Sequence, residues 1–322
     1  MMYDDLTIEG LIEKAEQLEQ SGRLTQALEV WRAITVRDPD PETLGEFANL
    51  AVKLERWAEA EEALMRASKI APELPNPHTL LGFLYFERNM LDKAVKCFQK
   101  SLAIEPSASV FTSLGVAQLE LGLTEDGRGS LEQAISLDPE YEEAYYNLGL
   151  VYRETEQSRS IDLFAKAVTL DPEYAQAHRE LGWALSRCEG KNAEAEYHVR
   201  RAIELNSEDG WAHIYLGNIL WQRNDLNFAE QSFKKAVEVW PNIGVPYWCL
   251  ALFYEHVGRM EDANRLYGQG VAVDPHDTEA NKLFGIYLND MGETARARTY
   301  LERALVSDPE DKRVIEILAK MR

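Results

Sequence analysis

The chain has 322 residues, of which 34 are basic and 55 are acidic, so its formal net charge is −21. This charge argues against a basic face for nucleic acid and against binding to an anionic membrane surface. Apolar residues make up 45% of the chain, which is typical of a folded protein and excludes a largely disordered one.

The first five residues contain neither a basic segment nor a long apolar stretch, so we expect no secretory signal peptide there. No run of about 18 apolar residues occurs, and we therefore expect no membrane-spanning helix. Cys97, Cys188 and Cys249 are widely spaced and form no CxxC pair, which favours small apolar core residues in a reducing, cytosolic (cytoplasmic) setting.

Three residue patterns recur along the chain with the same period. A proline, preceded in five copies by aspartate, returns every 33 to 35 residues, with serine in one copy: Pro39, Pro72, Pro106, Pro139, Pro172, Ser207, Pro241, Pro275 and Pro309. A Leu-Gly pair or a close variant precedes most of these positions by 24 to 26 residues, as at Leu148-Gly149 and Leu216-Gly217. Between the two lies a small–large–small pattern, as in Ala229, Phe233 and Ala236. A period of this length indicates a repeat protein.

The combined pattern resembles the tetratricopeptide repeat, and the resemblance covers essentially the whole chain. It implies an all-α fold, a right-handed superhelical solenoid of antiparallel helix pairs. On this interpretation residues 1–322 form a single solenoid rather than two domains. Its nine repeats open near Ile8, Pro41, Pro75, Ala108, Glu142, Ala175, Gly210, Gly244 and Thr278.

The spacing has a physical explanation. The glycine after the leucine lets the two helices of a repeat approach closely, and proline ends the second helix because it lacks an N–H and clashes with the preceding turn. One repeat cannot bury its apolar face alone, so neighbouring repeats supply the core. We expect residues 311–322 to form a capping helix, with Val314, Ile315, Ile317 and Leu318 on one side. Its polar face would consist of Lys312, Arg313, Glu316, Lys320 and Arg322.

No catalytic constellation is visible in the sequence. His78, His178 and His213 occupy the slot three residues before the leucine, where the family usually has tryptophan, and we expect them to pack between helices. HExxH, GxGxxG and GxxxxGK[ST] motifs are absent, so we expect no enzyme activity, no cofactor and no metal site.

The first helix of each repeat carries a second stripe of residues. At about 100° per residue, positions five and two before the leucine, and two and five after it, lie opposite the core face. The resemblance implies that this stripe lines a concave groove, where partner peptides bind. Aromatic and arginine residues are common binding hot spots, and an asparagine can bond a peptide backbone. The predicted partner-binding residues are Phe83, Phe86, Tyr146, Arg153, Arg179, Trp183, Arg187, Trp211, Asn218, Trp221 and Trp248. The alternative is that these rings only pack against neighbouring helices.

Two subtypes of the family are not supported. At the positions of a chaperone-tail clamp the first three repeats have Ile12, Glu16 and Glu46, followed by Asn76 and Leu80, instead of the clamp's lysines, asparagines and arginine. An asparagine ladder before Leu-Gly is also missing, because only Asn147 occupies that slot.

The sequence therefore predicts a non-catalytic adaptor or scaffold that binds a protein or peptide in its groove, mainly in repeats 5 to 8. A regulatory or scaffold subunit of an enzyme complex and a self-assembling scaffold are the alternatives. Residues 1–160 carry a net charge of −14 and residues 161–322 carry −7. An acidic partner would thus favour the arginines of the second half, and a basic partner the N-terminal groove. Neither nucleic acid nor a membrane is expected as a partner, and the oligomeric state stays open.

Overall fold

The structure is a computed structural model that describes residues 6–321. It divides into two compact units, unit 1 (Met1–Leu170) and unit 2 (Asp171–Arg322), which we describe separately. The first five residues, where no signal peptide is expected, and Arg322 of the expected capping helix lie outside the described residues.

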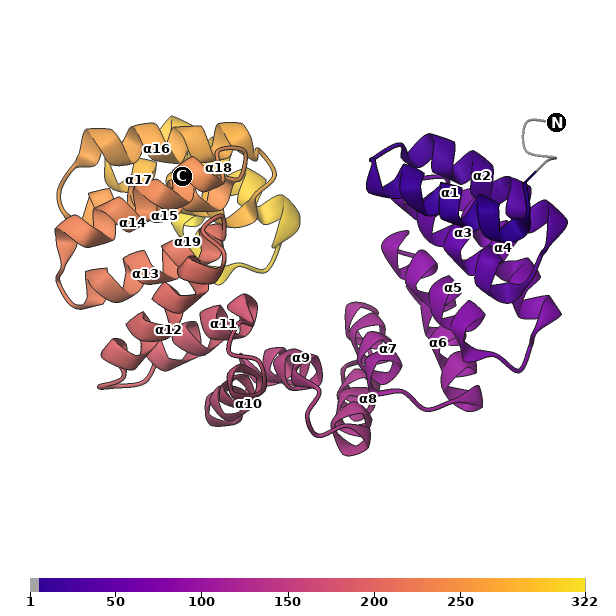
Figure 1. Cartoon of the computed structure of the whole chain (residues 1–322). Helices are drawn as coiled ribbons and strands as arrows, with labels where there is room; N and C mark the ends of the chain where they lie inside the picture. The colour runs from indigo at the N-terminus through magenta and orange to yellow at the C-terminus, as the bar shows by residue number, and fades with distance from the viewer. Residues whose placement is uncertain (1–5, 322) are drawn as a thin grey trace. The chain divides into compact units, whose positions relative to one another are not determined.

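Unit 1 consists of five helix pairs that follow one another in chain order (Figure 1). We call the first helix of each pair helix A and the second helix B. The ten helices are α1 (Ile8–Gln20), α2 (Leu24–Arg37), α3 (Pro41–Lys53), α4 (Trp57–Ile70), α5 (Pro75–Glu87), α6 (Leu91–Ile104), α7 (Ala108–Glu120), α8 (Thr124–Leu137), α9 (Glu142–Tyr152) and α10 (Gln157–Leu170).

Unit 2 continues the pattern with four helix pairs and one final helix (Figure 1). They are α11 (Ala175–Ser186), α12 (Asn192–Leu205), α13 (Gly210–Gln222), α14 (Leu226–Val239), α15 (Gly244–His256), α16 (Met260–Val273), α17 (Thr278–Asp290), α18 (Thr294–Ser307) and α19 (Lys312–Lys320). Between residues 6 and 321 every regular element is helical, so the predicted all-α solenoid of helix pairs is confirmed.

Local signals define the ends of these helices. The Asp40 carboxylate accepts hydrogen bonds from the backbone N–H groups of Glu42 and Thr43, and Pro41 opens α3. Both features satisfy or remove N–H groups that lack a partner inside the helix. The turn between helices A and B holds a residue with positive φ in eight of the nine described pairs, as at Gly122. Glycine adopts this conformation without the cost that a Cβ imposes.

In six of the nine described helix pairs, a glycine of helix A lies against an apolar side chain of helix B, and alanine takes this position in the other three. A Cβ built at Gly217 would lie 2.7 Å from Phe233, and one at Gly82 would lie 2.5 Å from Phe98. Both phenylalanine side chains are fully buried. The close approach that the Leu-Gly pattern predicts is therefore the central packing contact of the pair.

In repeats 5 to 9 a recurring hydrogen bond joins helix A to the turn before it. The side chain three residues before the leucine donates to the carbonyl oxygen six residues earlier, at 2.9 to 3.2 Å, in five successive repeats. The pairs are Tyr145 and Pro139, His178 and Pro172, His213 and Ser207, Tyr247 and Pro241, and Asn281 and Pro275. His178 and His213 are buried, so they pack between helices as predicted and also satisfy a carbonyl of the turn.

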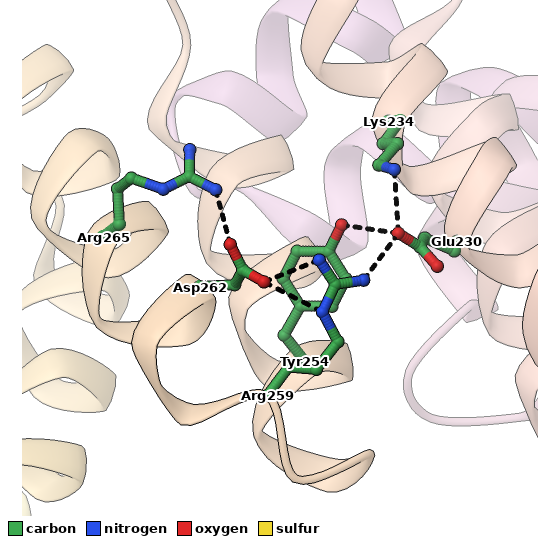
Figure 2. Close-up of polar contacts among 6 residues, drawn as sticks. All are labelled: Glu230, Lys234, Tyr254, Arg259, Asp262 and Arg265. Atoms are coloured by element: carbon green, nitrogen blue, oxygen red, sulfur yellow. Dashed lines mark hydrogen bonds and ion pairs between the residues drawn. The ribbon is translucent and has the colours of Figure 1, made fainter.

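A network of polar and charged residues links α14 to α15 and α16. Glu230 on α14 accepts hydrogen bonds from the Tyr254 hydroxyl (2.7 Å), Arg259 (2.9 Å) and Lys234 (2.8 Å), as Figure 2 shows. Arg259 also binds Asp262, and its guanidinium lies 4.0 Å from the centre of the Tyr254 ring. The hydrogen bond from Lys234, followed by those from Tyr254 and Arg259, lowers the pKa of Glu230 to about 2. This network ties repeat 7 to repeat 8.

The last helix, α19, covers the end of unit 2, but fewer of its apolar side chains contact the core than expected. Val314 is fully buried, and Ile317 and Leu318 pack against the same cluster. Ile315 is 45% exposed, so its predicted place on the apolar side is wrong. The helix presents only a narrow contact face, and Ile315 lies one residue beyond Val314, about 100° around the helix.

The glycine contact predicts opposite effects for two alanine substitutions in unit 2. Gly217→Ala should lower the free energy of unfolding by about 1 to 3 kcal/mol, because its methyl group meets the buried Phe233 ring. Gly268→Ala should raise it by up to about 1 kcal/mol, since its methyl group would lie 4.0 Å from Phe284 and alanine favours the helix. Urea unfolding followed by circular dichroism checks both, and equal effects would contradict the packing.

A second prediction concerns two histidines that share a hydrogen bond. The Nδ1 atoms of His178 and His198 lie 2.9 Å apart. Because His178 Nε2–H donates to Pro172, its Nδ1 must accept from the His198 Nδ1–H when both rings are neutral. Burial, with a smaller contribution from His178, lowers the pKa of His198 to about 4. Burial also lowers the pKa of His178.

These shifts predict a loss of stability in acid. The unfolded chain takes up protons below about pH 6.5, whereas folded His198 does so only near its lowered pKa. The free energy of unfolding should therefore fall by about 2 kcal/mol as the pH drops from about 6.5 to 4.5. The free energy of unfolding of His198→Gln should fall less over this range than that of the wild type. His276→Gln, at an exposed histidine, is the control and should behave like the wild type. Urea midpoints measured across the range check this, and an unchanged slope in His198→Gln would disprove it.

Candidate functional site

The C-terminal halves of three successive A helices in unit 2 enclose a surface concavity of about 500 Å³. Helix α11 contributes one wall, α13 the floor and α15 the opposite wall. The lining residues are Trp183, Ser186, Arg187, Tyr215, Asn218, Trp221, Gln222 and His256.

The floor follows from the period of α13. Tyr215, Asn218 and Trp221 are each three residues apart, and Gln222 follows directly, so all four lie on one face of the helix. The opposite face carries the buried core residues Leu216 and Leu220. The helix thus holds the floor rigidly through its core side.

A series of contacting side chains runs from the α11 wall to the floor on α13. The Arg187 guanidinium lies 4.6 Å from the centre of the Trp183 ring, and this ring lies 6.2 Å from the ring of Tyr215. Trp211 extends the series, with its ring 5.8 Å from Tyr215 and 6.0 Å from Trp240. Contacts of this kind add to apolar burial and hold the rings in place.

Trp221 reaches from the floor to the second wall. Its ring contacts His256 edge to face at 5.0 Å and Phe253 at 5.6 Å, and Phe233 lies behind it at 6.3 Å. Phe233 and Phe253 are fully buried, so the indole rests on the core of unit 2. This support fixes the orientation of the ring that the concavity presents.

The charges around this concavity differ from those around a second one in unit 1. No aspartate or glutamate is among the residues that line the concavity of unit 2, and Arg187 contributes a positive charge. The concavity of unit 1, about 590 Å³ in volume, lies at α1, α2 and α3. Its six lining carboxylates belong to Glu16, Glu19, Asp38, Asp40, Glu42 and Glu46.

The structure brings together four of the residues predicted for partner binding. Trp183, Arg187, Asn218 and Trp221 line the concavity of unit 2. Trp211 lies on the same face of α13, is 36% exposed, and packs on Tyr215 and Trp240 without lining it. All five residues belong to unit 2, and four of them line its concavity.

Two other predicted residues serve a joint between repeats. Arg179 Nη1 donates to Asp209 at 2.7 Å, and Trp248 Nε1 donates to Asp277 at 3.3 Å. Each aspartate also caps the next A helix, because its other carboxylate oxygen accepts a hydrogen bond from a backbone N–H group in the first turn of that helix. Lys282 makes the same contact with Asp311 at 3.6 Å. The stripe position two residues before the leucine is therefore engaged in holding successive repeats together.

The remaining predicted residues belong to unit 1. Phe83 is 41% exposed and lines a concavity of about 340 Å³ beside α3, with its ring 5.3 Å from Phe98. Phe86 packs against the core. The Tyr146 ring lies 5.9 Å from Phe164, and Arg153 pairs with Glu154 at 3.2 Å. None of these four lines the concavity of unit 2.

Four lining residues were absent from the predicted set: Ser186, Tyr215, Gln222 and His256. Gln222 and His256 occupy the position six residues after the leucine, as Arg187 does in its repeat. At about 100° per residue this position lies only about 20° beyond the edge of the stripe. A slightly wider stripe would have included it.

Among residues 6–321, no three His, Cys, Asp or Glu side chains come together in a group that could bind a metal ion. None of the described helices combines the length and the apolar character needed to cross a membrane.

The described helix pairs place the chain among the α-solenoid repeat proteins. Residues 75–108 match the family described as "Tetratricopeptide repeat", and residues 130–155 match the description "TPR repeat". Together with the nine tandem pairs, these matches show that the chain is a tetratricopeptide-repeat protein.

Curated relatives are much longer than the region they share with this chain. The probable peptide N-acetylglucosaminyltransferase SPINDLY of Hordeum vulgare is 30% identical over 154 residues, which cover 44% of this chain and 16% of that protein. The CTR9 homolog of Arabidopsis thaliana is 22% identical over 282 residues, which cover 83% of this chain and 26% of that protein.

Solved structures share the fold. A tetratricopeptide repeat protein from Parabacteroides merdae superposes with a TM-score of 0.64 at 17% identity, covering 77% of this chain and 98% of that one. A chain of the APC/C hetero-tetramer Cut9-Hcn1 gives 0.62 at 16% identity, with 92% and 59% covered. The tetratricopeptide fold supports a general role as a protein–protein interaction scaffold.

The joint between repeats predicts that Arg179 acts on stability. The side chains of Glu180 and Asp209, which share its guanidinium, are only 3% and 5% exposed. Arg179→Met should lower the free energy of unfolding by about 3 kcal/mol, because two buried carboxylates lose their shared cation. Arg313→Met, at an exposed position of α19, should leave it nearly unchanged. Chemical unfolding of both variants checks this, and equal stabilities would assign Arg179 another role.

Proposed function

We propose that this protein is a non-catalytic adaptor whose concavity in unit 2 holds a segment of a partner protein. The observation that carries the proposal is the set of two indole rings, one phenol ring and one guanidinium around a single hollow of about 500 Å³. Tryptophan, tyrosine and arginine dominate binding hot spots because they combine a large contact area with polar groups.

The site proposed here is narrower than the groove expected from the sequence. It comprises repeats 6 to 8, because Tyr146 and Arg153 of repeat 5 belong to unit 1. Asn218 and Gln222 on the floor offer amide groups that can bond the backbone of an extended peptide. The rings on either side would cover its side chains.

Two further points belong to the proposal. The repeat spacing continues from Pro139 to Pro172 without an inserted linker, which supports one uninterrupted array over residues 1–322. Among the described residues, Cys97, Cys188 and Cys249 form no disulfide, which supports a reducing, cytoplasmic location.

Partner capture from the native source tests the proposal. The amount of partner captured by Trp183→Ala or by Trp221→Ala should be about tenfold lower than with the wild type, because each substitution removes a ring that lines the concavity. Phe228→Ala is the control, since it removes an exposed aromatic ring of unit 2 that does not line the concavity. Mass spectrometry identifies the proteins, and circular dichroism confirms that each variant is folded.

The outcome also separates the alternatives. Unchanged capture by Trp221→Ala would disprove binding in the concavity. A stoichiometric enzyme among the captured proteins would favour a regulatory or scaffold subunit, and many substoichiometric partners would favour the adaptor. If light scattering shows that the particle size increases with the concentration of this protein, the self-assembling scaffold is favoured.

A further inference from the structure

We infer that unit 1 carries a second docking surface, which binds a basic segment of a partner protein: lysine or arginine residues beside one aromatic or aliphatic side chain. The surface, which we call the acidic groove, consists of the two concavities of unit 1, about 590 Å³ and about 340 Å³ in volume. The inference goes beyond the proposed function, because it concerns other helices and does not depend on the concavity of unit 2.

The two concavities are continuous along the A helices of repeats 1 to 3. Glu19 on α1 and Glu46 on α3 line both of them, and Phe83 on α5 lines the second. Because Glu42, Glu46 and Asn49 are three or four residues apart, one face of α3 contributes to both concavities. A partner segment that crosses these helices can therefore occupy both.

Carboxylates dominate the lining of the acidic groove. Six of them line the first concavity, Glu87 adds a seventh in the second, and Lys53 is the one basic residue in the two linings. Among residues 6–321, the side chains of Glu16, Glu42 and Glu46 form neither a hydrogen bond nor an ion pair, and all three are exposed. Their negative charges are therefore unpaired within this part of the chain.

Two glutamates on the B helices differ from those of the groove, because they pair within the protein. Glu59 on α4 contacts Arg32 and Arg56 at 2.5 Å, and Glu29 on α2 contacts Arg32 at 2.8 Å. In the groove, by contrast, like charges lie close together and repel one another. A lysine or arginine of a partner would relieve this repulsion and donate charge-assisted hydrogen bonds to the carboxylates.

Apolar side chains complete the lining. The larger ones in the second concavity are Leu50, Val52, Leu64, Leu80, Phe83 and Leu84. Phe83 is 41% exposed, and its ring is held edge to face on Phe98 at 5.3 Å. An apolar patch of this kind, rimmed by charged residues, is typical of an interaction site. The partner therefore needs an aromatic or aliphatic side chain to cover Phe83, and the apolar stems of its lysines and arginines can extend the contact.

Charge disfavours other occupants of the acidic groove. A second copy of this chain carries the same net charge of −21, and a nucleic-acid backbone is also anionic, so both would be repelled. A basic segment is instead attracted before contact, over the range of about 10 Å that salt screening leaves at about 0.1 M salt.

A library of random peptides displayed on phage tests the inference. The immobilised full chain selects peptides of about 12 residues, and the selection is repeated on the groove variant, which combines Glu16→Gln, Glu42→Gln and Glu46→Gln. The wild type should enrich peptides with lysine or arginine beside an aromatic or aliphatic residue. The groove variant should lose this enrichment, because the carboxylates that pair with the basic residues are gone.

A matched control separates the groove from the overall charge. Glu73→Gln, Glu105→Gln and Glu140→Gln, combined in one chain, change the net charge by the same amount at exposed positions of unit 1 outside the groove. This control variant should select the same peptides as the wild type. Circular dichroism verifies that each variant is folded.

A synthetic copy of the most enriched peptide then gives affinities by fluorescence anisotropy. The groove variant should bind it at least about tenfold more weakly, and Phe83→Ala at least about threefold more weakly. Raising the salt concentration from about 0.1 M to about 1 M shortens the Debye length from about 10 Å to about 3 Å. Binding should therefore weaken more in the wild type than in the groove variant.

The possible failures are distinguishable. If no enriched peptide depends on the three glutamates, or if those that do are acidic, the inference is overturned and the proposed function is untouched. Equal affinities of the peptide for the wild type and Phe83→Ala would also overturn it. Loss of binding in Trp221→Ala would assign the peptide to the concavity of unit 2 instead. A dimer that light scattering detects in the wild type but not in the groove variant would make a second copy the occupant.

Discussion

The close contact between a helix A glycine and a helix B ring is the constraint on which the rest of this structure depends. At Gly217 the backbone of α13 lies against Phe233, and no side chain larger than hydrogen fits between them. Gly182 and Gly285, at the equivalent positions of two other repeats, make the same close approach to Val199 and Leu301, so equivalent positions of the A helices of unit 2 lie side by side. Residues about 34 apart in the sequence, such as Trp183 and Asn218, therefore line one hollow.

A second constraint decides which residues of the stripe can meet a partner. Asp209 and Asp277 each use one carboxylate oxygen to cap a helix and the other to hold a side chain of the preceding repeat. The side chains they hold, Arg179 and Trp248, look like binding residues on a helical wheel. In the structure they are part of the connection between repeats, and the proposed site lies toward the C-terminal ends of the A helices.

Most of the fold could be predicted from the sequence, because a fixed period repeated nine times outweighs any local ambiguity. The candidate site could be predicted only in part. Periodicity places Trp183 and Trp221 on one face, but it does not show that Arg179 meets Asp209, since that contact joins residues 30 apart across two repeats. His256 was missed for another reason: its position, six residues after the leucine, falls about 20° outside the ideal stripe.

The positions six residues after the leucine have a further consequence. Arg187, Gln222 and His256 occupy them in three successive repeats, and all three are exposed. The three residue types differ, and all three lie outside the Leu-Gly, small–large–small and proline patterns that build the core. Folding therefore places few demands on these positions, and in the proposed site they can be selected for binding alone. A duplicated copy of this gene could acquire a new partner through these few codons, with its scaffold unchanged.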